Sequence, residues 1–284
     1  MTDVFTDNRG LLFSVAYRLT GSVADAEDIV QDSWLRWSST DTDQVRAPVP
    51  YLVKTVTNLA LNQLTSARAR RETYVGPWLP EPLLTSEDAA EEVEMADSVS
   101  MAMLVVLESL SPLERAVFVL GDVFGYGQAE IAGMLDRDPA AVRQLAHRAR
   151  EHVQAHRPRY ATDDATRADV VARFLAACNG ADLNELMAVL APDVTAWSDG
   201  GGKVAAARRP VVGADNVARW FMGILRKTET QGMSVEPVRI NGELSLLGTV
   251  EGVPIGSVHF DVDGNRIAGL RLVINPDKLR GLRH

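Results

Sequence analysis

The sequence predicts a multidomain fold, in which two all-α domains, the second a helix-turn-helix, are followed by an α+β domain. Apolar residues recur with a helical period through residue 157, and the period falls to two beyond residue 234. Between the two helical parts, a stretch over 73–97 is acidic and contains three prolines. The chain has 284 residues, of which 46% are hydrophobic and 24% charged, which excludes wholesale disorder and allows two or three domains.

Several protein classes are excluded by what the sequence lacks. It has no run of 18 apolar residues, and its first ten residues do not form a basic segment followed by an apolar one. Cys178 is the only cysteine, so neither an internal disulfide nor a cysteine-based zinc site can form. The five histidines are scattered or gather near the end of one helix. We therefore expect a cytoplasmic protein without membrane segment, metal or cofactor.

The net charge of −9 is concentrated in one place. Residues 73–100 hold seven Asp and Glu and no Lys or Arg. This pattern predicts an acidic linker over 73–97. The acidic balance argues against nonspecific coating of DNA, but it permits local basic faces that contact phosphates.

The first predicted domain, residues 1–72, begins with two helices. The first has an apolar stripe at i, i+3, i+4 and i+7, formed by Leu12, Val15, Ala16 and Leu19. Gly21 ends it, and Ser22 with Asp25 predicts a capping box that opens the second helix, which runs to residue 37. One face of this second helix carries the acidic stripe Asp25, Asp28 and Asp32, which is either a docking surface or an ordinary solvated face.

The third helix of this domain is predicted from Pro50 to about Arg71. One of its faces carries an aromatic residue and polar residues at helical spacing, namely Tyr51, Thr55, Asn58 and Asn62, and its end carries Arg68, Arg70 and Arg71. Such residues can stack on bases, form hydrogen bonds with them and hold phosphates. The alternative is a solvated face with basic residues that complement the helix dipole.

The second predicted domain spans 98–157. Ser111, Pro112 and Glu114 predict a capped helix start. Two further helices, Gln128–Leu135 and Pro139 to about Gln154, are separated by a three-residue turn, as in a helix-turn-helix. The last helix has a buried stripe and an outer face with Arg143, Gln144, His147, Arg148 and Arg150. These residue types contact base edges and phosphates, although basic helical pairs also occur in proteins that never bind DNA.

The third predicted domain spans 163–284 and is α+β. Three amphipathic helices come first, the third over about Ala214–Arg226. Four strands follow, predicted over Ser234–Ile240, Glu243–Val250, Ile255–Val262 and Arg266–Ile274. Asn241-Gly242 and Asp263-Gly264 supply the two-residue hairpin turns.

Four segments of the helical part form an ordered set: 21–37 (GSVADAEDIVQDSWLRW), 51–71 (from YL through NLA to RARR), 111–118 (SPLERAVF) and 127–150 (GQAEIA through VRQLAHRAR). In this order and spacing they resemble extracytoplasmic-function sigma factors. The resemblance implies a protein that binds core RNA polymerase through Asp25, Asp28, Asp32 and Leu35. It also implies that the third helix reads the minus-ten promoter element and the helix-turn-helix reads the minus-thirty-five element.

Three further motifs are Trp78-Leu79-Pro80-Glu81-Pro82, Asp199-Gly200-Gly201-Gly202-Lys203 and Asn275-Pro276-Asp277-Lys278-Leu279. They resemble the signatures of the subgroup of these sigma factors that carries a fused SnoaL-like domain of the NTF2-like cone fold. The resemblance implies a non-enzymatic, monomeric factor whose C-terminal domain restrains the DNA-binding domains and supports polymerase binding. The acidic linker would follow the RNA exit path of the polymerase. A small ligand in the cone remains an open alternative.

Two rival hypotheses belong to other classes. The C-terminal domain could catalyse a reaction, or bind a ligand, while tethered to a DNA-binding module. Its candidate residues are Trp197, Asp199, Trp220, His259 and Asp261, in which a carboxylate would act as general base. The alternative is that both tryptophans are core residues, Asp199 a turn residue and His259 a solvent-facing strand residue. A dimeric repressor with a ligand domain is disfavoured, because it would not need the first domain.

Overall fold

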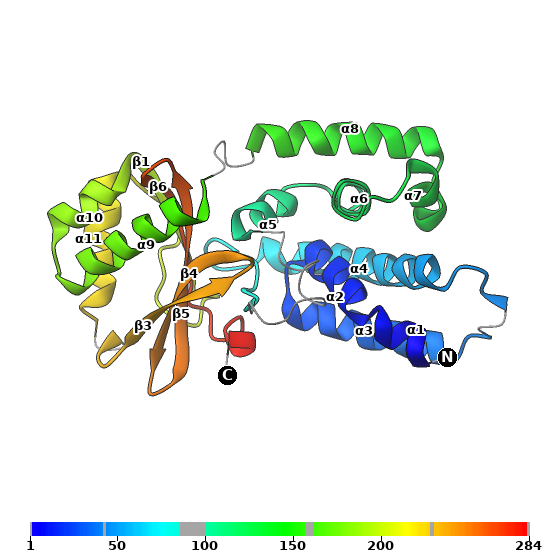
Figure 1. Ribbon diagram of the computed structural model, residues 1–284, viewed down its shortest axis with the longest axis horizontal. Coiled ribbons are helices and arrows are strands. Elements are labelled where there is room, and N and C mark those ends of the chain that lie inside the picture. The colour runs from blue at the N-terminus through cyan, green and yellow to red at the C-terminus, as the bar shows by residue number, and fades with distance from the viewer. Residues whose placement is uncertain (1, 42–43, 86–99, 157–161, 228–229, 283–284) are drawn as a thin grey trace. The chain divides into compact units, whose positions relative to one another are not determined.

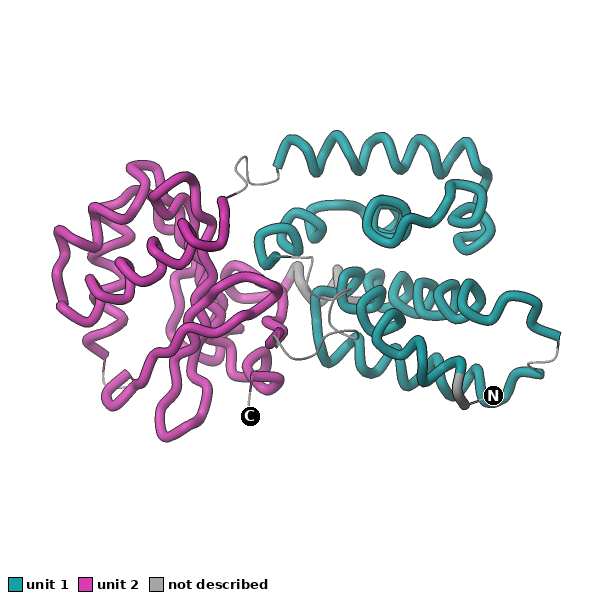
Figure 2. Tube along the Cα trace, in the orientation of Figure 1, with its two compact units in different colours: residues 1–72, 86–157 teal, residues 73–85, 158–284 magenta. Residues whose placement is uncertain are grey.

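The structure is a computed structural model that describes residues 2–41, 44–85, 100–156, 162–227 and 230–282, with the backbone alone for 2–3 and 66–72. The chain forms two compact units (Figure 2). Unit 1 contains Met1–Glu72 and Ser86–Arg157, and unit 2 contains Thr73–Thr85 and Pro158–His284. Both predicted helical domains therefore lie in unit 1. No helix among the described residues is long and apolar enough to cross a membrane.

Unit 1 is all-α (Figure 1). Its elements are α1 Thr2–Asp7, α2 Arg9–Thr20, α3 Val23–Ser38, α4 Pro48–Glu72, α5 Met101–Glu108, α6 Pro112–Phe118, the π-helix η2 Val119–Val123, α7 Gln128–Leu135 and α8 Pro139–His156. Helix α2 packs against α3 and α4, and α6 packs against α8. The apolar stripe predicted for the first helix is fully buried in this packing.

The helix boundaries of unit 1 follow from local chemistry. Gly21 adopts a left-handed conformation, with φ of 68°, and ends α2. The Ser22 hydroxyl accepts a hydrogen bond from the Asp25 amide at 3.1 Å, so Ser22 is the N-cap of α3 at the predicted place. The predicted start of α4 at Pro50 is wrong, because the helix begins at Pro48. Both prolines fit the first turn, where no amide donor is required, so composition could not distinguish them.

Unit 2 is α+β. Helices α9 Asp164–Asn179, α10 Leu183–Val189 and α11 Ala214–Leu225 cover one face of a six-stranded sheet (Figure 1). The strands are β1 Leu190–Asp199, β2 Val211–Val212, β3 Ser234–Ile240, β4 Glu243–Val250, β5 Val253–Asp263 and β6 Arg266–Val273, in the order β2-β1-β6-β5-β4-β3. The core lies between the helices and the sheet, with Phe174, Phe221 and Phe260 packed edge to face. The predicted fold class is thus confirmed.

Strands β1 and β2 and one turn differ from the sequence prediction, and β5 begins at Val253, two residues before its predicted start. Strand β1 was not predicted, and Asp199, a turn residue in the non-catalytic alternative, lies in it; β1 pairs in parallel with β6. Pro192-Asp193 resembles a turn in sequence, and the register of β1 shifts across this segment. The short β2 was also missed. Asn241 and Gly242 both have positive φ, as predicted, but the second hairpin turns one residue later than predicted, at Gly264-Asn265.

The predicted acidic linker, residues 73–97, is not one uniform segment. Its first part, Thr73–Thr85, belongs to unit 2, where Leu84 bridges to Ile240 and the Thr85 amide donates to the Arg239 oxygen at 3.0 Å. This segment therefore extends the sheet beside its edge strand β3. The remainder of the linker, from residue 86, lies outside the described residues.

Candidate functional site

The helix-turn-helix is formed by α7 and α8. The Glu130 carboxylate accepts a hydrogen bond from the Gly127 amide at 2.8 Å, which fixes the start of α7 although glycine has no capping side chain. Asp136 ends α7 in a left-handed conformation, with φ of 50°. Val142, Ala146, Ala149 and Val153 are buried as predicted, while Leu145 is half-buried. The outer face of α8 therefore points to solvent.

The five residues predicted to contact the minus-thirty-five element are all exposed on α8, but they differ in their partners. Arg148 pairs with Glu114 at 2.8 Å, and Arg150 pairs with Asp122 at 2.7 Å. The bond from Arg148 lowers the pKa of Glu114, and the bond to Asp122 raises the pKa of Arg150. Both arginines are thus oriented by acids, with which DNA phosphates would have to compete.

The predicted minus-ten residues lie along one side of α4. Tyr51 is half-buried and its ring packs against Trp37, with 5.8 Å between centroids, while Thr55 donates to the Tyr51 main-chain oxygen at 2.9 Å. Asn58 is half-buried and Asn62 is exposed. Of these four residues, Tyr51, Thr55 and Asn58 are therefore half-buried, and Asn62 is exposed to solvent. The side chains of Arg68, Arg70 and Arg71 lie outside the described residues.

The same side of α4 carries a contact that the sequence did not reveal. The Lys54 ammonium donates to the Gly133 oxygen at 2.9 Å and to the Asp136 carboxylate at 2.8 Å, at the end of α7. Within unit 1, the third helix of the first predicted domain therefore contacts the helix-turn-helix of the second. Spacing from Tyr51 places Lys54 near the polar face, but no sequence pattern shows its partner.

The acidic stripe of α3 is not uniform. Asp28 and Asp32 are exposed, and Leu35 is exposed to 58%, which is unusual for a large apolar side chain. Asp25 is half-buried and accepts a hydrogen bond from Gln63 of α4 at 2.7 Å. The stripe therefore comprises Asp25, which ties α3 to α4, and two aspartates that face solvent beside the exposed Leu35.

In unit 2, the three C-terminal motifs meet around the buried Asp199 carboxylate, which is 0% exposed. We call this cluster the clasp, and it consists of Tyr74, Trp78, Leu79, Asp199, Asn275 and Lys278. Asp199 Oδ1 accepts bonds from the Tyr74 hydroxyl at 2.5 Å and the Gly201 amide at 3.1 Å. Its Oδ2 accepts from the Leu79 amide at 2.8 Å and from Lys278 Nζ at 2.7 Å. One carboxylate thus binds segments that lie far apart in the chain.

Further contacts close the clasp. Asn275 donates to the Tyr74 hydroxyl at 2.9 Å, and Lys278 donates to the Leu79 oxygen. The Lys278 ammonium lies 4.0 Å from the centroid of the Trp78 ring, a cation–π contact. Burial and the bond to Asp199 raise the pKa of Tyr74, so its hydroxyl stays protonated and donates. Tyr74 precedes the linker motif, and sequence reasoning missed it.

The glycines of the second motif are explained by this crowding. Gly201 has φ of 60°, and a Cβ there would lie 2.4 Å from the Asn275 amide nitrogen. A Cβ on Gly200 would lie 2.6 Å from the Val204 oxygen. Lys203 pairs with Asp277 at the exposed edge and lowers its pKa. The other motif residues include Pro80, Glu81, Pro82 and Leu279, which are buried, and Gly202 and Pro276, which are exposed.

Three residues of the catalytic alternative, Trp197, His259 and Asp261, lie around Arg271 in the sheet. Trp197 stacks on Arg271, which pairs with Asp261 and neighbours His259 in the sheet register. His259 is 3% exposed, so its predicted solvent-facing position is wrong. Burial and Arg271 lower the pKa of His259 to about 3.

None of the five candidates lines the cavity of about 500 Å³ in unit 2, and Asp199 is occupied by the clasp. Within the described residues, no group of three or more His, Cys, Asp and Glu side chains could hold a metal.

Comparison with known proteins agrees with this architecture. The family model "Sigma-70 region 2" matches residues 4–70, and "Sigma-70, region 4" matches residues 100–153. The ECF RNA polymerase sigma factor SigJ of Mycobacterium tuberculosis is 41% identical over 95% of this chain and 90% of its own length. SigG of the same species is 31% identical over 66% of this chain and 60% of its own length.

The crystal structure of Mycobacterium tuberculosis SigJ superposes with a TM-score of 0.79 and 37% identity, and the match covers 99% of both chains. The likeness therefore includes unit 2 as well as the two matched sigma regions. This chain belongs to the family of ECF RNA polymerase sigma factors.

Proposed function

We propose that this chain directs core RNA polymerase to specific promoters and that its C-terminal domain regulates this activity through the clasp. The observation that carries the proposal is the exposed basic face of α8 in a helix-turn-helix, in a chain that matches both sigma regions in order. The polymerase supplies the chemistry, so the chain is not an enzyme. The place of action is the cytoplasm, and the factor is a monomer until it binds polymerase.

Promoter contacts divide between two surfaces. We assign base reading at the minus-thirty-five element to Arg143, Gln144 and His147, because these side chains are exposed on α8 and suit the edges of bases in the major groove. Arg148 and Arg150 contact phosphates after they exchange their acidic partners. At the minus-ten element, Asn58 and Asn62 reach opened bases, assisted by the ring of Tyr51 and by Thr55, and the arginines at 68, 70 and 71 hold phosphates.

Core polymerase binds the solvent-facing part of α3. Asp28, Asp32 and Leu35 follow one another at i, i+4 and i+7, so they share a face. The exposed Leu35, which follows the two carboxylates on this face, provides an apolar anchor beside polar groups, as protein interfaces combine them. Asp25 supports this face indirectly through its bond to Gln63.

The clasp supports regulation because it fixes the chain segment that follows α4. Tyr74 lies two residues beyond the end of α4, and its hydroxyl is held by Asp199 and Asn275. A closed clasp restricts the path of the chain between sigma regions 2 and 4. The part of the linker that follows the RNA exit path of the polymerase is the acidic stretch from residue 86 onward, because Thr73–Thr85 belongs to unit 2.

Run-off transcription with purified core RNA polymerase and a randomised promoter library tests this function. The full chain is expected to give initiation from a restricted set of promoters. Asp199→Asn, which removes the charge that holds Lys278, is expected to change the amount of transcript by at least about threefold and leave the selected promoter sequence unchanged. Lys203→Met is the matched control, because it removes the exposed ion pair with Asp277 and is expected to have little effect.

The outcomes separate the two parts of the proposal. Absence of polymerase-dependent initiation from any promoter would refute the sigma-factor activity. Equal transcription by the unaltered chain and folded Asp199→Asn would refute regulation through the clasp, while promoter selection would stand. Limited proteolysis within 74–79 shows independently whether the clasp has opened.

A further inference from the structure

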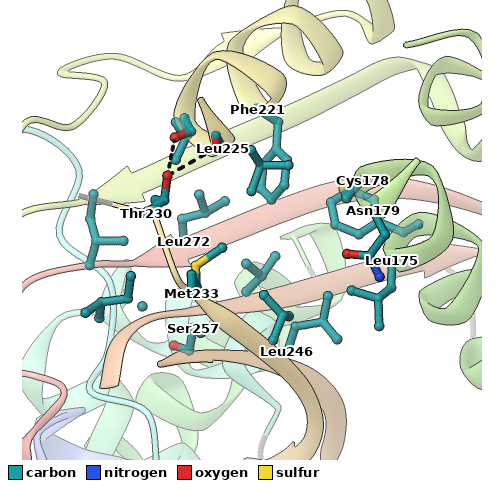
Figure 3. Close-up of a pocket in the computed structure, with 18 residues that line it drawn as sticks. Leu175, Cys178, Asn179, Phe221, Leu225, Thr230, Met233, Leu246, Ser257 and Leu272 are labelled. Carbon is teal, nitrogen blue, oxygen red and sulfur yellow. Dashed lines mark hydrogen bonds between the residues drawn. The ribbon is translucent and has the colours of Figure 1, made fainter. Parts of the chain in front are cut away.

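Unit 2 contains an open cavity of about 500 Å³ between its helices and its sheet (Figure 3). Helices α9 and α11 contribute Leu175, Cys178 and Leu225, and the sheet contributes Leu246, Ser257 and Leu272. This volume lies within the range of sites for drug-sized molecules. All of its described lining residues belong to unit 2.

The lining determines the chemistry of an occupant. None of the described lining residues is Asp, Glu, Lys, Arg or His, so an ionised group would lose its hydration without gaining a counter-charge. Burial raises the pKa of the Cys178 thiol to about 12, so the thiol is neutral at physiological pH. The hydroxyls of Thr230 and Ser257 already bond to the Lys227 oxygen at 2.7 Å and to His259 at 3.0 Å.

Among the described lining residues, the Asn179 amide remains available to an occupant. Asn179, at the end of α9, is exposed and makes no side-chain hydrogen bond to the described residues. It can donate to or accept from a single polar end of a molecule whose body lies among the aliphatic side chains. This arrangement, an apolar body site with one amide, resembles the sparse polar placement of small-molecule pockets.

The cavity wall continues directly into the clasp. Leu272 and Ile274 line the cavity, and the Ile274 amide donates to the Asp199 main-chain oxygen at 2.9 Å. The next residue, Asn275, bonds to Tyr74. Gly256 of β5 also lines the cavity, and its Cα has so little space beside Ile274 that a Cβ would lie 3.0 Å from that side chain. A shift of Ile274 therefore reaches Asp199 and Asn275 through adjoining atoms.

We propose that this cavity binds a neutral, mostly apolar small molecule with one hydrogen-bonding end, and that its occupancy alters the clasp through Ile274. The binding half is independent of promoter-directed transcription. The regulatory half rests on the proposed function of the clasp. The effector is thus a neutral organic molecule, rather than a nucleotide, a phosphorylated metabolite or a metal ion.

Two dyes that share one ring system test the binding half on the full chain. N-phenyl-1-naphthylamine is neutral, and 8-anilino-1-naphthalenesulfonate adds only a sulfonate. The neutral dye is expected to bind saturably with enhanced fluorescence, and the sulfonate at least about tenfold more weakly. Absence of saturable binding by the neutral dye, or equal affinity for both, would overturn the proposal.

Substitutions at the single cysteine locate the dye. Cys178→Phe fills the cavity and is expected to weaken binding of the neutral dye at least about tenfold, while Cys178→Ala keeps its affinity within about threefold. Equal binding by both folded variants would place the dye elsewhere and overturn the assignment. If Cys178→Phe does not fold, protection of the Cys178 thiol in the unaltered chain tests the location of the dye instead. Saturating dye must slow the modification of Cys178 by N-ethylmaleimide, and an unchanged rate would also overturn it.

Hydrogen exchange tests the regulatory half without polymerase or DNA. With the neutral dye bound, exchange of the Leu79 amide, which donates to Asp199, is expected to change at least about threefold. Binding without any change in this exchange would refute the connection to the clasp and leave a ligand site alone. Because these assays contain no transcription machinery, their failure is distinguishable from failure of the sigma-factor activity.

Discussion

Arg115 of α6 donates a hydrogen bond from its Nε to the main-chain oxygen of Arg18 in α2 across 2.9 Å, between residues 97 positions apart in the chain. Arg115 also pairs with Glu108, and its side chain is only 3% exposed. Burial lowers the pKa of Arg115 to about 9, which still leaves the guanidinium charged at neutral pH. This buried contact and the exposed Lys54–Asp136 pair both join the two helical segments within unit 1, but they differ in solvent access.

Replacing Arg115 is expected to destabilise unit 1 far more than replacing Lys54. Arg115→Met removes a buried guanidinium that pairs with Glu108 and donates to the Arg18 oxygen, so it should lower the free energy of unfolding by about 3–5 kcal/mol. Lys54→Met should cost less than about 1 kcal/mol, because its partner Asp136 is 76% exposed. Hydrogen exchange of the α2 amides measures both. Similar losses for the two variants would contradict the assigned role of burial.

Substitutions on α8 should separate base contacts from phosphate contacts when the chain is bound to core polymerase. Gln144→Ala is expected to cost about 1–3 kcal/mol of promoter binding and relax the sequence preference. Arg150→Ala is expected to weaken all sequences alike and reduce the salt slope by about one. Asp122→Asn should strengthen binding, because it frees Arg150 from its 2.7 Å partner. Binding assays over a range of salt concentrations distinguish these outcomes, and identical slopes for the unaltered chain and Arg150→Ala would exclude the phosphate contact.

The elements that were predicted from sequence are those fixed by neighbours in the chain. The Ser111–Glu114 capping box of α6 forms as expected, and so does the Asn241-Gly242 turn, because each depends on contacts within three residues. Strand β1 was missed because its parallel partner β6 lies more than 60 residues away and because Pro192 interrupts its pattern. The spacing of apolar residues along the chain could not reveal the pairing of β1 with β6.

The candidate sites also differ in whether they depend on neighbours in the chain or on distant residues. The exposed face of α8 follows from helical period alone, so its five polar residues were found. The contribution of Tyr74 depends on Asp199, 125 residues away, and that of Lys54 on Asp136, 82 residues away. No spacing rule predicts such pairs. The three motifs were recognised separately by resemblance, whereas their meeting around one carboxylate emerges only from the folded sheet.

A methyl group at Gly201 should open the clasp, and Gly264 supplies a matched control. Both glycines have nearly equal positive φ, 60° and 57°, so alanine at either position carries a similar backbone strain of about 1–2 kcal/mol. Only at Gly201 would the new Cβ meet Asn275, since nothing lies within 4 Å of the Cβ position at Gly264. Gly201→Ala should therefore accelerate exchange of the Leu79 amide strongly and Gly264→Ala should not. Equal acceleration would show that backbone strain, rather than the contact with Asn275, determines the effect.

The buried His259 should make unit 2 less stable in mild acid. Burial and Arg271 lower its pKa from 6.5 to about 3, while its two ring nitrogens contact Ser245 and Ser257. Between these pH values the unfolded chain binds a proton that the folded chain does not, so stability falls as the pH falls, by up to about 1.4 kcal/mol per pH unit. His259→Gln keeps a polar side chain but cannot titrate, so its stability should depend less steeply on pH between 6.5 and 5. Chemical denaturation of both chains at these two pH values measures the difference, and equal pH dependence would mean that His259 takes up a proton in the folded domain.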